Sequence, residues 1–498
     1  MKRSQEGGRP DAVVRSWRSI LLFWAPLAVQ WIMMSAEGPF LAAIIARMGD
    51  PTTNLAAYGV AVAFAILTES PVIMLMSAST ALVEDSESHR RLRHFGVALN
   101  LAATALVVLV VVPPVFRFLT GTLLGLPGEV AALVYGSIWL LLPWPGAIGY
   151  RRFLHGLLIR SGKTRLVAYG TLLRLGGMAA TGMLLYAFSP FPGAWVGAIS
   201  LSAGVVLEAV AARFMARGEV ARLTGTGGAA VVLPPEAVTG TTEPQTAREA
   251  GSGGEEVAGT EAATMRRLIL RGESALRRTG AAAMTLGRRA IAGYGDIARF
   301  YFPLALTSLI GLTVQPMLTF FMGRATLPLE SLAVFPVVHG LSFLFRSPGI
   351  AFQEVVIALS GKRLEHIRPL ARFGFGLGST VTAIFALVVF TPLASLWFET
   401  VSGLSPELAA LATGPAQISV PLAGLTVLIA FQNAVLVQVR RTQQITAASV
   451  FEIAGIAVLF TLAGWRFGLF GASAAMVGLV GGRVLANGYL WTRVRRVL

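Results

Sequence analysis

The sequence predicts an all-α polytopic membrane protein with twelve transmembrane helices in two six-helix lobes, related by a pseudo-two-fold axis along the membrane normal. Composition, the spacing of apolar segments and an internal repeat support this prediction. Of the 498 residues, 55% are hydrophobic and 13% are charged, and the mean hydropathy is +0.69. Soluble domains carry about 25% charged residues, whereas an ionised side chain facing lipid costs several kcal/mol. The chain has no cysteine, which excludes disulfides, zinc–thiolate sites and cysteine nucleophiles.

Apolar segments of about 20 residues, long enough to cross a ~30 Å hydrocarbon core, recur along both halves of the chain. In the first half they lie near 20–45, 55–82, 95–116, 130–158, 166–188 and 195–215. In the second half they lie near 299–322, 332–359, 373–396, 416–438, 445–463 and 470–491.

Basic residues distinguish the two sides of these segments. Arginine and lysine cluster before the first segment, after the second, fourth, eighth and tenth, and near the last residue, whereas the intervening loops hold about one arginine each. By the positive-inside rule both termini are cytoplasmic, and we expect a multi-pass protein of the bacterial cytoplasmic (inner) membrane. The rule also accounts for the net charge of +16 without a nucleic-acid partner. The first apolar segment is too long for a cleavable signal peptide.

Residues 218–296 interrupt the pattern and divide an N-terminal six-helix lobe (1–217) from a C-terminal one (297–498). Between 224 and 264 the chain is rich in Gly, Ala, Thr, Glu and Pro, which predicts a disordered cytoplasmic linker. Residues 265–293 combine arginines with apolar side chains, which favours a basic amphipathic helix on anionic lipid head groups. A plain solvated connector is the alternative.

The two lobes are copies of one another. When Phe23–Leu82 is laid on Phe300–Leu359 without a gap, an arginine and four prolines fall in register. These pairs are Arg47 with Arg324, Pro26 with Pro303, Pro39 with Pro316, Pro51 with Pro328, and Pro71 with Pro348. Six spans return the chain to its starting side, so both copies have the same orientation. This is the parallel-repeat arrangement, in which substrate sites lie near the midplane between the repeats.

Four of these prolines lie inside the first and second helix of each copy: Pro39, Pro71, Pro316 and Pro348. A proline inside a helix frees a backbone carbonyl and bends the helix, which is tolerated where a cavity or a hinge needs it. We therefore interpret them as gating elements. The alternative is that proline is simply common in membrane helices.

Ionisable residues inside the predicted spans are candidates for a substrate or coupling-ion site. Glu69 and Arg346 occupy the same repeat position, as do Arg174 and Glu452, with opposite charges in the two copies. The members of a pair could meet across a central cleft, or each could hold a substrate group or a proton. A static ion pair inside one lobe is the alternative.

The first helix of each copy adds further polar candidates. Glu37 has no acidic counterpart in the second copy and is a candidate for proton or sodium coupling. Gln30 and Gln315 lie in the same two helices and join the candidate binding set. Arg151 and Arg152 either line an inner vestibule or extend to the membrane interface.

Enzyme motifs are missing from the sequence. Gly156–Thr164 (GLLIRSGKT) has five residues before its Gly-Lys where a phosphate loop needs four, and no strand precedes it. No HExxH, GxSxG or clustered His/Asp metal spacing occurs. We therefore expect no metal, no cofactor and no catalytic residues, with a membrane-embedded enzyme as the alternative of a different class.

Two local motifs resemble a known superfamily. Arg152–Arg165 (RFLHGLLIRSGKTR) resembles the helix 4–5 junction of the multidrug/oligosaccharidyl-lipid/polysaccharide (MOP) flippase superfamily, which includes the multidrug and toxic compound extrusion (MATE) transporters. Leu55–Ala61 (LAAYGVA), with Pro71 further along, is similar to helix 2 of progressive-ankylosis (ANK)-type transporters. The fold-level resemblance covers nearly the whole chain outside 218–296.

The resemblance implies a V-shaped pair of lobes that open alternately to each side of the membrane, around a central cleft lined by helices 1, 2, 7 and 8. Substrates of the superfamily range from organic cations, exchanged for protons or sodium, to lipid-linked sugars and organic anions. Between Phe300 and Arg324 no acidic residue matches the coupling residue often found in cation exporters, and Arg174, Arg346 and Arg483 favour an anion. We therefore expect a monomeric secondary transporter that exports a small organic, anionic solute. A proton- or sodium-coupled organic-cation antiporter and a lipid-linked precursor flippase are the alternatives.

Overall fold

The computed structural model describes residues 17–161, 163–224, 293–361, 364–439 and 441–498. All but the last residue of the predicted basic helix 265–293 lies outside the described residues, as does the predicted disordered segment from 225 onward.

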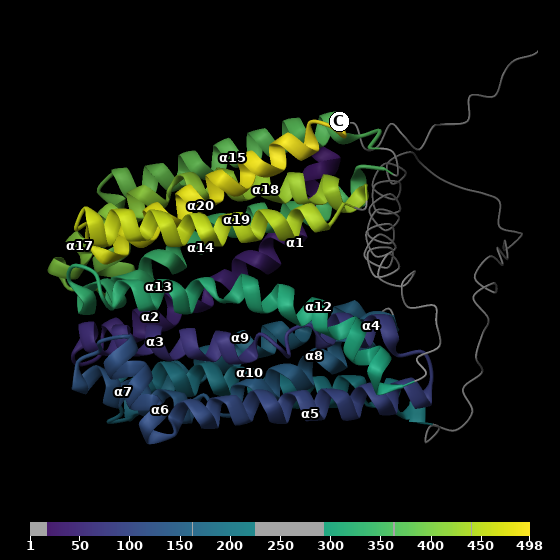
Figure 1. Cartoon of the computed structure of the whole chain (residues 1–498), viewed down its shortest axis with the longest axis horizontal. Coiled ribbons are helices and arrows are strands. Elements are labelled where there is room, and N and C mark those ends of the chain that lie inside the picture. The colour runs from purple at the N-terminus through teal and green to yellow at the C-terminus, as the bar shows by residue number, and fades with distance from the viewer. Residues whose placement is uncertain (1–16, 162, 225–292, 362–363, 440) are drawn as a thin grey trace, which may run out of the picture.

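The described chain is helical almost throughout (Figure 1). In the first half the elements are α1 (Trp17–Ser35), α2 (Glu37–Ala46), α3 (Pro51–Glu69), α4 (Leu75–Leu82), α5 (Ser86–Val111), α6 (Pro113–Arg117), the π-helical turn η2 (Phe118–Leu123), α7 (Gly128–Leu140), α8 (Trp144–Arg160), α9 (Thr164–Phe188) and α10 (Gly193–Thr224). In the second half they are α12 (Tyr294–Leu312), α13 (Val314–Met322), α14 (Pro328–Leu359), α15 (Ile367–Phe390), α16 (Leu393–Ser395), η3 (Leu396–Val401), α17 (Pro406–Ser419), α18 (Pro421–Gln438), α19 (Gln443–Phe460), η4 (Thr461–Arg466) and α20 (Gly471–Val494).

Within this described part, eleven helical segments are long and apolar enough to cross a membrane. The predicted twelfth span forms the helix α20, which packs against α18 and α19 but is not among those eleven. Its 24 residues include several glycines as well as Arg483 and Asn487, which lower its apolar character. The all-α polytopic membrane architecture is confirmed, and the count of twelve spans stays a prediction.

Prolines set several of the helix boundaries. Pro51 and Pro328, which are repeat equivalents, each occupy the first turn of a helix, where the missing N–H would have no partner anyway. The residues before them, Asp50 and Leu327, are both left-handed, with φ of 49° and 51°. The two copies therefore make the same sharp entry into their second long helix.

The predicted bends at the other prolines are visible at three of the four positions. Pro39 and Pro316 lie just after the breaks between α1 and α2 and between α12 and α13, and Pro71 lies in the turn between α3 and α4. Pro348 lies inside α14 without ending it. Pro71 and Pro348 cannot donate to the carbonyls four residues before them, on Leu67 and Leu344, and each of these carbonyls accepts a 2.8 Å hydrogen bond from the hydroxyl of the serine before the proline.

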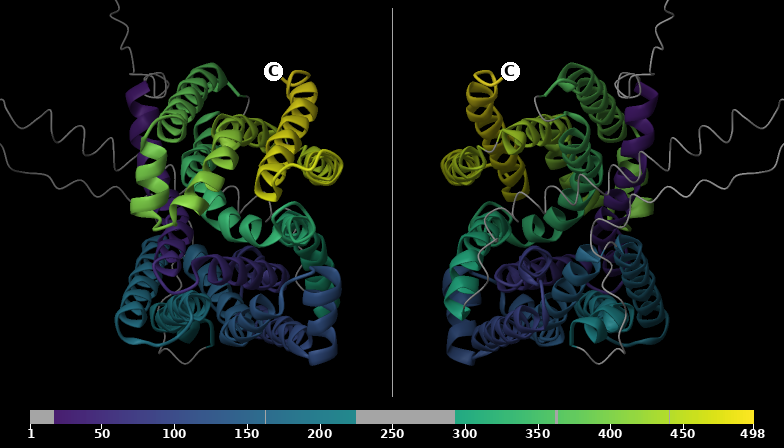
Figure 2. Two further views of the ribbon diagram at one scale, coloured as in Figure 1. Left: turned by 90° about the vertical axis from the view of Figure 1, so that its left-hand side faces the viewer. Right: turned by 90° about the vertical axis from the view of Figure 1, so that its right-hand side faces the viewer.

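The two halves form two bundles, but the first helix of each copy crosses to the other bundle (Figures 1 and 2). α1 packs against α14 and α15 of the second half, and α12 packs against α5 and α3 of the first half. Equivalent aromatic side chains hold both crossings. Trp24 Nε1 donates a 3.0 Å hydrogen bond to the carbonyl oxygen of Pro348, and the Tyr301 hydroxyl donates a short one to the carbonyl oxygen of Pro71.

Because of this exchange, the two bundles in the structure do not coincide with the two lobes predicted from the sequence. The predicted N-terminal lobe of 1–217 contains α1, which lies on the opposite bundle, and α10 continues past 217 to Thr224. Hydropathy along the chain locates a helix but carries no information about which bundle it packs against.

Candidate functional site

Five ionisable side chains meet inside the first half, where α2, α8, α9 and α10 converge. They form the N-lobe cluster: Glu37, Arg151, His155, Arg174 and Glu208. Arg174 Nη2 donates a short hydrogen bond to Glu37 Oε1, and Arg174 Nε lies 3.3 Å from Glu208 Oε2. Arg151 Nη1 donates to the same Glu208 oxygen at 2.5 Å. Two carboxylates thus neutralise two guanidinium groups inside the helix bundle.

Local sequence explains how these groups come together. Glu37 is the first residue of α2, after the helix break, where free N–H groups favour a carboxylate. Gly204 lets α10 approach α9 closely, because a Cβ there would lie 2.9 Å from the carbonyl oxygen of Arg174. Gly170 leaves space for the cluster, since its Cβ would lie 3.5 Å from Glu208, whose side chain is fully buried.

The second half carries a simpler counterpart. Arg483 Nε on α20 donates a 2.8 Å hydrogen bond to Glu452 Oε1 on α19. Arg174 on α9 and Glu452 on α19 are repeat equivalents, so the same two helices of each copy are linked by an ion pair whose charges are exchanged. Arg174 and Glu452 each find a partner inside their own half, so in this structure they do not meet across the two halves.

Glu69 and Arg346 are also held separately. Trp144 Nε1 on α8 donates a 2.5 Å hydrogen bond to Glu69 Oε2, whereas Arg346 Nε donates to Thr426 Oγ1 at 3.3 Å. No ion pair joins Glu69 to Arg346 among the described residues. The predicted central pair is therefore two separate polar sites on facing helices of the two halves, α3 and α14, which contact each other.

The two glutamine candidates differ in their surroundings. Gln315 Nε2 lies 3.4 Å from both ring nitrogens of His339, whose ring stacks between Phe335 and Phe343. Gln30 is exposed on α1. The structure brings neither of them to the N-lobe cluster.

Arg152 and Arg346 lie inside spans and have no carboxylate within 4.0 Å in the described chain. Arg152 Nη1 reaches only the Met76 sulfur, at 4.0 Å, and its Nε is buried without a hydrogen-bond partner. Arg346 has the Thr426 hydroxyl alone. Arg152 lies in the first half and Arg346 in the second.

At the end of the molecule that the loop charges predict to be extracytoplasmic, Arg47 and Arg324 each reach from one half to the other. Arg47 Nη2 donates to the carbonyl oxygens of Thr400 and Val401 at 2.5 and 3.0 Å. Arg324 Nη2 and Nε donate to those of Thr122 and Leu123 at 2.5 and 2.9 Å. We call these two contacts the arginine latches. Each neutralises the carbonyl end of a π-helical turn, η3 or η2, that belongs to the other half.

A glycine closes the loop behind each π-helical turn. Gly125 and Gly403 are repeat equivalents with φ of +66° and +72°, a region that favours glycine. A Cβ at Gly403 would lie 2.8 Å from Arg47 Nη1, whereas a Cβ at Gly125 would meet nothing closer than 3.7 Å.

Replacing either glycine with alanine is expected to cost about 1–2 kcal/mol of stability for the left-handed backbone. Gly403→Ala is expected to cost more than Gly125→Ala, because the new methyl group also displaces Arg47 from its latch. Thermal unfolding of the purified variants in detergent measures both. Equal melting temperatures for the two variants would show that the Arg47 latch does not contribute to stability.

Several of these residues were not assigned to the binding set from the sequence. Arg151, which the sequence left open between an inner vestibule and the membrane interface, belongs to the N-lobe cluster together with Glu208, and Trp144 binds Glu69. Nothing in the linear pattern indicates which side chains they face. The latches had a usable signal, since Arg47 and Arg324 match in register in loops with little other charge. Within the described part of the chain, no group of three or more His, Asp or Glu side chains is placed to hold a metal ion.

Comparison with solved structures relates this architecture to known ones. A structure described as the inward-facing conformation of a multidrug resistance MATE family transporter of the MOP superfamily aligns over 94% of this chain and 95% of its own, with a TM-score of 0.63 and 15% identity. Lipid II flippase MurJ in an inward closed conformation aligns over 95% and 87%, with a TM-score of 0.64 and 12% identity. The chain has a MATE-like fold. The outward-facing conformation of a multidrug resistance MATE family transporter aligns over 100% and 99%, with a TM-score of 0.54 and 15% identity.

The MATE-like fold confirms the superfamily resemblance inferred from the sequence at the level of architecture. Neither the protein-family models nor the curated proteins give a match to this sequence. The similarity to ANK-type transporters rests on the motif in α3 and stays a prediction.

Proposed function

We propose that this chain is a secondary active transporter that exports a small organic anion by alternating access between its two bundles. The solved structures that share the fold are described as multidrug transporters and a lipid flippase, which supports transport over membrane-embedded catalysis. The pseudo-symmetric bundles, with hinged first helices that cross between them, suit a rocking motion around a central site.

The observation that supports an anion is the pair of guanidinium groups without carboxylate partners, Arg152 and Arg346. An unpaired charge inside a membrane protein is costly unless something compensates it. The carboxylates Glu37, Glu208 and Glu452 are already bound by arginines, so they offer little to an organic cation. A soluble anion that reaches Arg346 would supply the missing negative charge.

The N-lobe cluster supports proton coupling over sodium coupling. A sodium ion would have to compete with Arg174 for the Glu37 carboxylate. A proton on Glu37, in contrast, would leave Arg174 with Glu208 as its one carboxylate and free its Nη2 for an anion. Binding of a proton and binding of an anion would then favour each other.

The conformation fits the part of such a cycle in which the outer side is closed. The arginine latches join the two halves at the predicted extracytoplasmic end. The TM-score is also higher against the inward-facing MATE structure than against the outward-facing one, 0.63 compared with 0.54. The predicted central cleft would then be reached from the cytoplasm.

Arg346→Gln is expected to abolish export of the anion while leaving stability nearly unchanged, because no buried carboxylate loses its partner. The measurement is untargeted mass spectrometry of the medium of cells that make wild type or Arg346→Gln at equal membrane levels. Organic anions should accumulate outside with wild type alone, and Arg346→Lys, which keeps the charge, should retain part of the export.

Identical media for wild type and Arg346→Gln would refute the anion proposal. The same cells then separate the alternatives. Efflux of cationic dyes that Glu37→Gln abolishes would indicate a coupled cation antiporter, and exposure of a lipid-linked precursor on the outer leaflet would indicate a flippase.

A further inference from the structure

A cavity of about 330 Å³ opens in the first half between α5, α8 and α10, with α4 at its base. Small-molecule sites commonly have volumes of about 300–1,000 Å³. α5 lies on the side of this bundle that faces away from the second bundle, and α12 is the helix of the second half that crosses to it (Figure 1). The cavity is therefore separate from the region between the two bundles in which we place the transported anion.

The walls of the cavity carry two guanidinium groups, from Arg93 on α5 and Arg213 on α10. No carboxylate in the described chain lies within 4.0 Å of either. The neighbouring carboxylates are engaged elsewhere. On α10, Glu219 is bound by Arg222 and by Lys163, with the lysine nitrogen 3.7 Å away.

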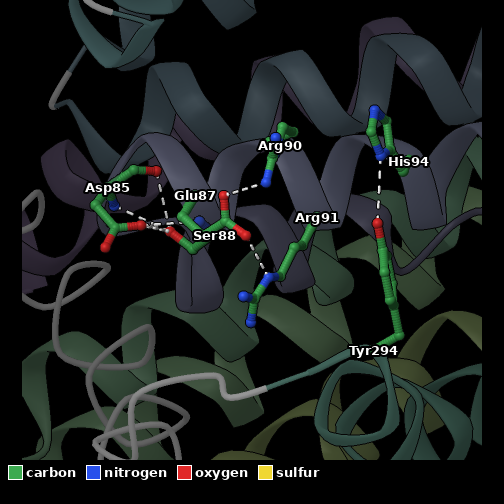
Figure 3. A network of polar contacts seen from close by, with 7 residues as sticks. All are labelled: Asp85, Glu87, Ser88, Arg90, Arg91, His94 and Tyr294. Carbon is green, nitrogen blue, oxygen red and sulfur yellow. Dashed lines mark hydrogen bonds and ion pairs between the residues drawn. The ribbon is translucent and has the colours of Figure 1, made fainter.

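At the start of α5, too, the carboxylates are already paired, whereas Arg93 has none (Figure 3). Glu87 binds Arg90 at 2.7 Å and Arg91 at 2.6 Å, so the only carboxylate in the first turn of the helix is already paired. Asp85 caps the helix, and the N–H and hydroxyl of Ser88 that donate to its carboxylate lower its pKa. Arg93 lies two turns further along the helix and makes none of these hydrogen bonds or ion pairs.

Two buried polar atoms in the cavity wall lack partners. His89 is 2% exposed, and its Nε2 has no hydrogen-bond partner. Asn100 Oδ1 is buried without a donor, beside the backbone of Gly149, where a Cβ would collide with it. Unsatisfied buried polar atoms are rare in native proteins and often mark a site for water, an ion or a ligand. Here the residues that carry them, His89 and Asn100, line the same cavity as the two arginines.

The rim of the cavity faces the membrane. Val97 and Tyr150 line the cavity and are 48% and 39% exposed, and Leu101 on the same helix is 66% exposed. Arg93 lies seven residues after the start of α5, so roughly 10 Å along its axis. That depth matches the head-group layer on the side that the loop charges predict to be cytoplasmic, and a tyrosine at the rim is typical of that layer.

We propose that this cavity binds the head group of an anionic phospholipid whose head group carries hydroxyls, with Arg93 and Arg213 holding the phosphate. Arginine forks suit phosphate oxygens. Rotation of the Asn100 and His89 side chains would let their unpartnered Oδ1 and Nε2 bind the head-group hydroxyls. The acyl chains lie on the exposed apolar surface of α5 around Val97 and Leu101. The open rim toward lipid favours a phospholipid over a soluble phosphate ester.

The test is native mass spectrometry of the delipidated full chain in detergent, titrated with phosphatidylglycerol, phosphatidylethanolamine or glycerol 1-phosphate. Wild type should bind one phosphatidylglycerol at least about tenfold more tightly than phosphatidylethanolamine. Arg93→Gln/Arg213→Gln should lose about tenfold or more in this affinity, and Arg90→Gln, whose arginine is paired with Glu87, should bind as wild type does.

Val97→Trp provides a second variant that keeps both charges and fills the rim from an exposed position. It should weaken binding of phosphatidylglycerol without changing the melting temperature of the lipid-free protein. Equal binding by wild type and the double arginine variant would overturn the proposal. Equally strong binding of glycerol 1-phosphate would overturn the lipid assignment, because it would show that the acyl chains contribute nothing.

Discussion

Replacing Glu208 with glutamine is expected to destabilise the folded protein by about 3–5 kcal/mol, the largest effect of any single substitution considered. Glu208 is fully buried and contacts both Arg151 and Arg174. Without its charge, Arg151 loses its only carboxylate partner inside the bundle, and Arg174 keeps Glu37 alone. Glutamine has nearly the same volume, so the loss reports charge rather than packing. Thermal unfolding in detergent, followed by the loss of monodisperse protein, measures it.

Glu87→Gln is the matched control for this prediction. Its carboxylate also binds two arginines but is 44% exposed, so we expect almost no change in the melting temperature. The double variant Arg151→Gln/Glu208→Gln should be more stable than Glu208→Gln, because it removes the guanidinium group that Glu208→Gln leaves without a carboxylate. If Glu208→Gln melts where Glu87→Gln does, the ion pairs of the N-lobe cluster do not form in the protein.

Removing both arginine latches with Arg47→Gln/Arg324→Gln is expected to open the extracytoplasmic end. Each latch makes two charge-assisted hydrogen bonds between the halves. These bonds are exposed, so we allow about 1 kcal/mol or somewhat more for each latch. The loss of both would shift the balance between closed and open states by roughly 30- to 100-fold.

The absence of native cysteine gives a clean measurement of this opening. Leu332 on α14 is 4% exposed, and its backbone lies against Gly59 of α3 between the two halves. A cysteine at Leu332 should react slowly with a membrane-impermeant thiol reagent on intact cells. It should react at least about tenfold faster in the double latch variant, with intermediate rates for the single variants.

Arg117→Gln is the control for the latches, because Arg117 donates only to the carbonyl oxygen of Pro113 in its own helix. It should leave the reaction rate at Leu332→Cys unchanged. Unchanged labelling in the double latch variant would refute the latches as an outer gate. Faster labelling only in inside-out vesicles would place them at the cytoplasmic end and reverse the predicted topology.

The sequence predicts those parts of the fold that depend only on residues close to one another along the chain. A span needs a run of apolar residues whatever surrounds it, so hydropathy alone is enough to locate the membrane-crossing segments. The breaks before Pro39 and Pro316 are predictable for a similar reason, because a proline removes an N–H from its own helix. The register between the two copies likewise predicts a related pair of bundles.

The partners of the charged residues cannot be read in this way. Glu69 and Arg346 match in the repeat, yet each binds a neighbour in its own half. Which side chain a buried charge meets depends on the rotation of each helix about its axis and on small residues such as Gly204 that let two helices approach. The sequence supplies the charges but not these angles and distances.

The sequence by itself thus determined that the chain is a duplicated membrane bundle with hinged first helices. Hydropathy and proline act within one helix, and the repeat is visible by comparing the two halves of the sequence directly. The tertiary structure alone decided that α1 and α12 cross to the opposite bundle, that the buried charges pair within each half, and that Arg47 and Arg324 bridge the two. Those outcomes depend on contacts between residues hundreds of positions apart. Their free energies are set by burial and by the geometry of approach, and local sequence pattern does not encode either.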